Sequence, residues 1–145
     1  ALVSRPAPSQ PIPPYKCGME RYALRLAYEG TDFHGWQRQE PPDQAPLRTV
    51  QGELDRALSE VLQRPVNCQG ASRTDAGVHA ECQVAAFSAP CRVPLERLPA
   101  ALNARLPEDV RVMRAWAVPA DFDPVTDAQS KGYRYEIVRL QPFRE

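Results

Sequence analysis

The sequence lacks the marks of a membrane or secreted protein, and it carries no net charge. No apolar run approaches the roughly 18 residues that cross a bilayer, and no basic segment followed by an apolar one opens the chain. Lysine and arginine together number 18, as do aspartate and glutamate, so no basic tail indicates a nucleic-acid partner. We therefore expect a cytoplasmic protein without a membrane partner.

Lysine is nearly absent: two of the 18 basic residues are lysines and the other 16 are arginines. The planar guanidinium group suits phosphates and carboxylates, and it can stack on bases. On composition alone, a genome-level preference for arginine explains this bias better than a binding role does.

Metal-binding patterns are also absent. The four cysteines form no CxxC pair, and His34 and His79, the two histidines, are not spaced like zinc ligands. Cys68 and Cys82 fall in apolar segments and are predicted to be small core residues. We expect reduced thiols and no structural metal.

The chain divides into a short extension and one domain. Residues 1–19 form a proline-rich N-terminal extension that is predicted to be disordered, and residues 20–145 form an α/β domain. Thr49 is predicted to cap the first helix, Pro65 to end it, and Pro99 to lie in the first turn of the second helix. Periodicity predicts a strand at 22–28, a helix at 49–64, strands at 65–69 and 81–88, a helix at 99–106, and strands at 109–118 and 133–140.

The first six predicted elements follow the order of the split βαβ, ferredoxin-like fold, and one further strand follows them. The fold class is therefore α+β, with an antiparallel sheet and both helices on one face. Something must cover or bind the other face, but the fold alone names no function.

One loop is unusually long. The stretch GASRTDAGVHA, Gly70 to Ala80, joins two strands that should be neighbours, although hairpin loops usually take 2 to 5 residues. Arg73 and Asp75 are two residues apart, so in an extended segment they point to the same side and can meet. A guanidinium keeps a nearby carboxylate ionised, and such a carboxylate can act as a nucleophile. Spacing alone equally allows Thr74 or Asp75 to cap a short helix, with Arg73 on the surface.

His79 follows the aspartate by four residues. It could act as a general base, but no second partner for such a role is visible in the sequence. A packed histidine that donates a hydrogen bond to the backbone is the favoured interpretation.

Six motifs in order resemble the tRNA pseudouridine synthase A family. They cover about residues 20 to 140 and read YEGTDFHGWQRQ, TVQGELDRALSEVL, GASRTDAGVHA, LNARLP, DFDP and KGYRYEIV. The resemblance implies an isomerase that converts uridine to pseudouridine in the anticodon stem-loop of transfer RNA, at tRNA positions 38–40. It also implies that no cofactor and no metal are needed, and that the enzyme is a homodimer.

The same resemblance assigns roles to five residues. Asp75 matches the essential catalytic aspartate of the family. Arg73 matches the arginine that positions this aspartate and helps to extrude the base, and Tyr133 matches the aromatic residue that packs on the target uracil. Gln37 and Arg38 fall in a loop that is expected to contact the RNA. Without the resemblance, Tyr133 would be interpreted as a core tyrosine on a strand.

Two departures from the family pattern stand out. Family members usually carry an arginine shortly after the phenylalanine of the DFDP region, where Val125 stands here, and Lys131 or Arg134 would have to replace it. The family also has two halves of similar fold, and this chain matches only the N-terminal catalytic half. We expect weak or no activity from this half alone unless it pairs with another copy.

Two other functions fit parts of the pattern. KGYRYEIV partly matches the RNA-binding strand of an RRM, which suggests a non-catalytic RNA-binding module, but that strand would be third of four rather than last. A ferredoxin-like domain without a nucleic-acid partner is supported chiefly by the zero net charge.

Overall fold

The computed structural model describes residues 20–139, so the predicted disordered extension at 1–19 lies outside the described residues, as do residues 140–145. The elements follow the order strand, helix, strand, strand, helix, strand, which confirms the first six predicted elements. They are β1 (Arg21–Tyr28), α1 (Val50–Leu62), β2 (Gln69–Gly70), β3 (Ala80–Ser88), α2 (Leu98–Asn103) and β4 (Val110–Val118).

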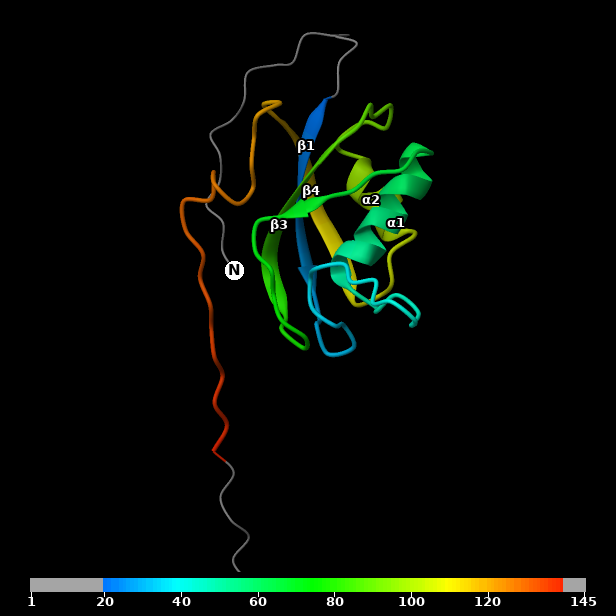
Figure 1. The fold of residues 1–145 in the computed structure, drawn as a ribbon. Coiled ribbons are helices and arrows are strands. Elements are labelled where there is room, and N and C mark those ends of the chain that lie inside the picture. The colour runs from blue at the N-terminus through cyan, green and yellow to red at the C-terminus, as the bar shows by residue number, and fades with distance from the viewer. Residues whose placement is uncertain (1–19, 140–145) are drawn as a thin grey trace, which may run out of the picture.

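The four strands form one antiparallel sheet in the order β2-β3-β1-β4, and both helices lie on the same face of it (Figure 1). This arrangement confirms the α+β, ferredoxin-like class. Strand β1 is an inner strand that pairs with β3 and β4, and its alternate residues Tyr22, Leu24 and Leu26 are all buried in the core between sheet and helices. Among residues 20–139, no helix is long and apolar enough to cross a membrane.

Helix α1 begins as the sequence predicts and ends slightly earlier. The Oγ1 of Thr49 accepts a hydrogen bond from the backbone N–H of Gly52 at 3.2 Å, which confirms the predicted N-cap. Gln63 adopts the left-handed conformation with φ of 52° and ends the helix before Pro65 is reached. Helix α2 likewise ends at Asn103 instead of continuing to residue 106.

Two predicted strands differ in the structure. The strand predicted at 65–69 is reduced to the two residues of β2. The final strand predicted at 133–140 is wrong over its described part, because residues 133–139 join no sheet. Tyr135 and Ile137 are 87% and 92% exposed. Their alternation suits a half-buried strand, but this segment runs along the side of the sheet away from the helices without a strand to pair with (Figure 1).

The sheet face opposite the helices carries a second, smaller apolar cluster. It is built from Ala23, Ala71 and Val84, with Trp116 and Phe122 packed against them. We call this side of the sheet the open face, because no helix covers it (Figure 1). The segment after β4 crosses this side of the sheet (Figure 1).

Candidate active site

The long loop between β2 and β3 occupies residues 71–79, as the sequence predicts. Its first residue remains attached to the sheet, since the N–H of Ala71 donates to the carbonyl of Val84 at 2.8 Å. The fully buried side chain of Gln83 donates to the carbonyl of Ser72 at 2.6 Å. Sequence reasoning missed Gln83, although an amide side chain inside the apolar stretch of β3 was the signal that could have revealed it.

A second loop, residues 29–36, supports the first from behind. The N–H of Trp36 donates to the carbonyl of Thr74 at 3.0 Å, and the N–H of Gly77 donates to the carbonyl of Phe33 at 3.3 Å. The two backbones approach so closely that a Cβ on Gly35 would lie 2.6 Å from the carbonyl oxygen of Thr74. Only glycine fits such an approach, and Gly35 also has a φ of +85°.

Asp75 and Arg73 are both exposed on this supported loop. Within residues 20–139 no ion pair joins them, so the predicted meeting of carboxylate and guanidinium is not formed here. The chain turns directly after Asp75: the N–H of Val78 donates to the carbonyl of Asp75, and Gly77 has a φ of +80°. No helix follows the aspartate, so the helix-capping alternative is wrong.

Tyr133 reaches this loop through its hydroxyl group, although it belongs to no strand. Its hydroxyl oxygen lies 2.9 Å from the Oγ of Ser72, and 61% of the residue remains exposed. Lys131, two residues earlier, donates to the carbonyl of Ala71 at 2.5 Å. The structure thus brings Tyr133 to the residue before Arg73, with most of its surface free.

A second tyrosine contact stabilises the loop from within. The hydroxyl of Tyr28, at the end of β1, lies 2.7 Å from the Oγ1 of Thr74, and burial raises the pKa of this tyrosine. Tyr28 therefore stays neutral at physiological pH and anchors the residue next to Asp75.

Gln37 and Arg38 fall in different surroundings. Gln37 lines a hollow of about 380 Å³ that Arg73, Val125 and Lys131 also line. Lys131 therefore provides a cation in the same hollow as Val125. Arg38 lies instead in a neighbouring hollow of about 420 Å³, and its guanidinium is 2.5 Å from Glu40.

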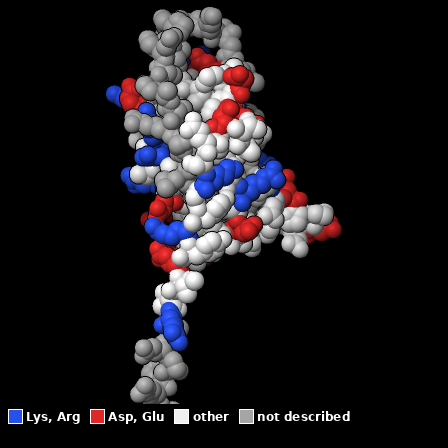
Figure 2. Space-filling view, turned by 90° about the vertical axis from the view of Figure 1, so that its left-hand side faces the viewer, with Lys and Arg blue, Asp and Glu red and all other residues white. Residues whose placement is uncertain are grey.

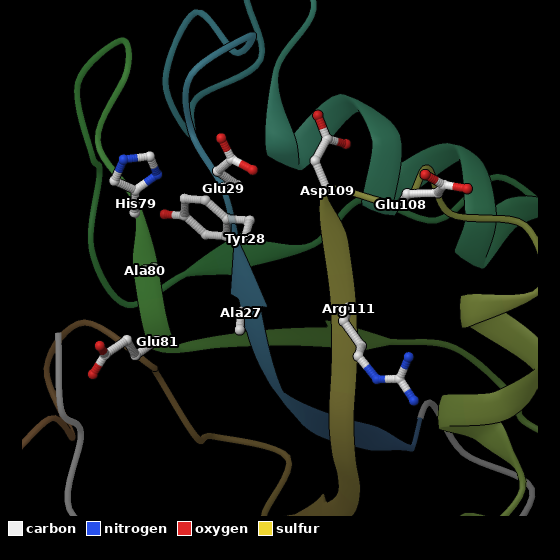
Figure 3. Close-up of a pocket in the computed structure, with 9 residues that line it drawn as sticks. All are labelled: Ala27, Tyr28, Glu29, His79, Ala80, Glu81, Glu108, Asp109 and Arg111. Carbon is white, nitrogen blue, oxygen red and sulfur yellow. The ribbon is translucent and has the colours of Figure 1, made fainter.

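His79 bonds to the backbone, as the favoured interpretation expects, but as an acceptor. The N–H of Gly30 donates to its Nδ1 at 3.0 Å, which links the Asp75 loop to the supporting loop once more. Figure 3 shows His79 at the rim of a hollow of about 520 Å³, near Glu29 and with Glu81 and Asp109 among its other lining residues. These carboxylates make that hollow unsuited to a phosphate, and Asp75 does not line it.

No group of three or more metal-binding side chains occurs in the part of the chain that the structure describes. The feature that stands out is the exposed carboxylate of Asp75, on a loop that hydrogen bonds hold on several sides. Comparison with known proteins shows the family to which the chain belongs.

The family model described as tRNA pseudouridine synthase matches residues 26–127, which is more than half of the chain. The chain belongs to this family. The tRNA pseudouridine synthase A of Thermosipho melanesiensis is 46% identical to it over 124 residues, which cover 82% of this chain and 47% of that protein. The tRNA pseudouridine synthase A of Methylacidiphilum infernorum is 48% identical over 114 residues, which cover 79% of this chain and 43% of that protein.

The chain thus spans less than half the length of the curated relatives it matches. The matched family region contains the whole loop at 71–79 and the loop that supports it. Tyr133 lies beyond the region that the family model matches, but its hydroxyl contacts Ser72 inside that region.

Proposed function

We propose that this chain supplies the catalytic carboxylate of a pseudouridine synthase that acts on the anticodon stem-loop of transfer RNA. The observation that carries the proposal is the position of Asp75. It is a solvent-exposed carboxylate on a loop that hydrogen bonds fix to β3, to the supporting loop and to Tyr28. A reactive group held in place by rigid surroundings loses little entropy when the substrate arrives.

The reaction breaks the bond between uracil nitrogen and ribose and forms a bond from a uracil carbon to the same ribose atom. The carbon gives up its proton and the nitrogen gains one, so the product is an isomer. The carboxylate of Asp75 has three chemically reasonable roles: attack on the ribose, attack on the uracil, or removal of a sugar proton. Each needs an ionised carboxylate within reach of the flipped nucleotide.

The target base must first leave the helical stack, which costs a few kcal/mol. We assign Arg73 to the space that the base leaves, and Tyr133 to stacking on the uracil, which is worth about 1–3 kcal/mol. The exposed ring of Tyr133 and the free guanidinium of Arg73 support these roles. Gln37 shares a hollow with Arg73, which supports an RNA contact there.

Arg38 is also proposed as an RNA contact, and its ion pair with Glu40 would have to open for it to bind a phosphate. A homodimer and a cytoplasmic location remain predictions; sedimentation of the purified chain tests the first.

The test is pseudouridine mapping on a transfer RNA transcript by carbodiimide-blocked reverse transcription. It uses the chain of 145 residues and a chimera that joins this chain to the C-terminal part of the Thermosipho melanesiensis relative. The chimera should form pseudouridine, and Asp75→Asn should abolish the product while leaving RNA binding intact. Asp121→Asn is the matched control, because Asp121 is an exposed aspartate elsewhere on the domain.

Full activity of the Asp75→Asn chimera would overturn the catalytic assignment. RNA binding without product from the unsubstituted chimera would instead favour the non-catalytic RNA-binding module.

A further inference from the structure

Two arginines face each other on the open face of the sheet. Arg25 of β1 and Arg114 of β4 are direct Cα partners in the antiparallel pair, and both are exposed. Side chains two residues apart on a strand share a face. Arg25 therefore lies on the face of Ala23, and Arg114 lies on the face of Trp116, both members of the apolar cluster there.

A β-bulge puts Arg114 on this face. Arg25 pairs with Arg114 and Leu26 pairs with Val112, so Met113 is the extra, unpaired residue. Val112 is buried toward the helices, and if the strand alternated regularly from Val112, with no bulge, Arg114 would point the same way. Bulges are frequent next to functional sites because they re-aim a side chain in this manner.

Neither arginine has a counter-charge among residues 20–139. The side chain of Arg25 makes no ion pair or hydrogen bond there, and neither does the guanidinium of Arg114, which lies 5.6 Å from the centroid of the Trp116 ring. By contrast, the guanidinium of Arg48 bonds both carboxylate oxygens of Asp109. Like charges directly opposite each other destabilise a sheet, so an anion bound between Arg25 and Arg114 would relieve a repulsion.

The pair lies in line with the Asp75 loop. The loop begins at Ala71, whose N–H donates to the carbonyl of Val84 in β3. In the sheet register, Val84 lies opposite Arg25 of β1, and Arg25 lies opposite Arg114 of β4. Neighbouring strands are about 4.8 Å apart, so the two arginines lie about 10 and 15 Å from Ala71 along this row. Figure 2 views the molecule from the open side and shows Lys and Arg side chains lying next to one another there.

We propose that Arg25 and Arg114 together bind backbone phosphates of the RNA whose uridine is presented to Asp75. The inference rests on the proposed function and extends it to a second contact on the open face. The planar guanidinium group matches the geometry of a phosphate, and the two guanidinium groups of Arg25 and Arg114 can hold an RNA strand that passes between them. Such contacts position the RNA without reading its sequence.

The test measures binding of a fluorescein-labelled anticodon stem-loop RNA by anisotropy over a range of salt concentrations. The unsubstituted chain and chimera are compared with Arg25→Gln, Arg114→Gln and the double variant. Each single change should weaken binding several-fold and lower the slope of log K against log salt by about 1. Arg25→Lys should keep the salt slope, because the charge remains.

Thermal unfolding of the free protein is a second, independent readout. Removing either arginine relieves the cross-strand repulsion, while Arg114→Gln also loses the contact with Trp116. Arg25→Gln should therefore unfold at the same temperature as the unsubstituted protein or a higher one, and Arg114→Gln at about the same temperature. Weaker binding together with undiminished stability separates a phosphate contact from loss of structure. Arg64→Gln is the matched control, since Arg64 is an exposed arginine directly after α1 whose side chain makes no ion pair among residues 20–139.

Affinity and salt slope equal to those of Arg64→Gln in all three glutamine variants would overturn the proposal, while the assignment of Asp75 would stand. A chimera that binds no RNA at all would overturn the proposed function itself. A salt slope that falls equally for Arg64→Gln would show that only the total charge matters and would also refute a specific clamp.

Discussion

The contact between the Asp75 loop and its supporting loop leads to a sharp prediction at Gly30. A Cβ at this position would lie 2.0 Å from the carbonyl oxygen of Val78 and 3.0 Å from the carbonyl carbon of Gly77. Both are backbone atoms of the Asp75 loop, so no flexible side chain can move aside. In Gly30→Ala the loop backbone must therefore retreat by roughly 1 Å or more to reach ordinary contact distance.

The cost has two parts. Overfilling a packed site costs about 1–3 kcal/mol. The same movement lengthens the 3.0 Å hydrogen bond from the N–H of Gly30 to the Nδ1 of His79, and its loss costs about 1 kcal/mol. We expect the free energy of unfolding to fall by about 2–4 kcal/mol, which corresponds to a melting temperature lower by on the order of 10–20 °C.

Circular dichroism during heating measures the loss of stability, and pseudouridine formation by the chimera measures the displacement of Asp75. Activity should fall at temperatures where Gly30→Ala is still folded, because misplacing a catalytic group by about 1 Å can cost about 100-fold in rate. Gly132→Ala is the control, since nothing lies within 4 Å of a Cβ at that position. The reasoning is refuted if Gly30→Ala unfolds within about 0.5 kcal/mol of the unsubstituted protein and stays fully active.

Three further predictions concern the fold. Leu54→Ala removes a fully buried side chain from α1 and should lower the free energy of unfolding in urea by about 2–5 kcal/mol; a loss below 1 kcal/mol would contradict the packing. Thr49→Ala removes the acceptor for the N–H of Gly52 and should cost about 1 kcal/mol in the same assay, with no loss if the cap is dispensable. Hydrogen bonds from Arg48 lower the pKa of Asp109 below its ordinary 3.8, so this stabilisation is present above pH 3.8 and is lost as the pH falls below it. Arg48→Gln should therefore flatten the acid limb of the stability–pH curve, and an unchanged limb would refute the pair's role.

Much of the fold could be predicted because its signals are local. Alternation of apolar residues identified β1 and β4, and helical spacing after a threonine identified α1 with its cap. Burial on one side of an element leaves such periodicity in the sequence wherever the core decides it. The prediction of a strand at 133–139 was wrong, because the alternation of this segment is not matched by a partner strand.

The candidate site divides in a similar way. The length and composition of the loop at 71–79 and its family motif were enough to single out Asp75 and Arg73. The absence of an ion pair between them among residues 20–139 and the turn that follows Asp75, with its hydrogen bond from Val78 and its positive φ at Gly77, cannot be inferred from spacing. The buried amide of Gln83 that holds the loop is likewise a tertiary contact, formed across two strands.

By itself, the sequence determined the order of the six elements, the family motifs and the carboxylate to which we assign the chemistry. Only the tertiary structure decided what surrounds that carboxylate and which charges lie opposite each other in the sheet beside its loop. Arg25 and Arg114 are far apart in the chain, and the register of β1 against β4, shifted by the extra residue Met113, makes them partners. Local periodicity cannot encode such a pairing, because the packing of the whole sheet fixes the register of two strands.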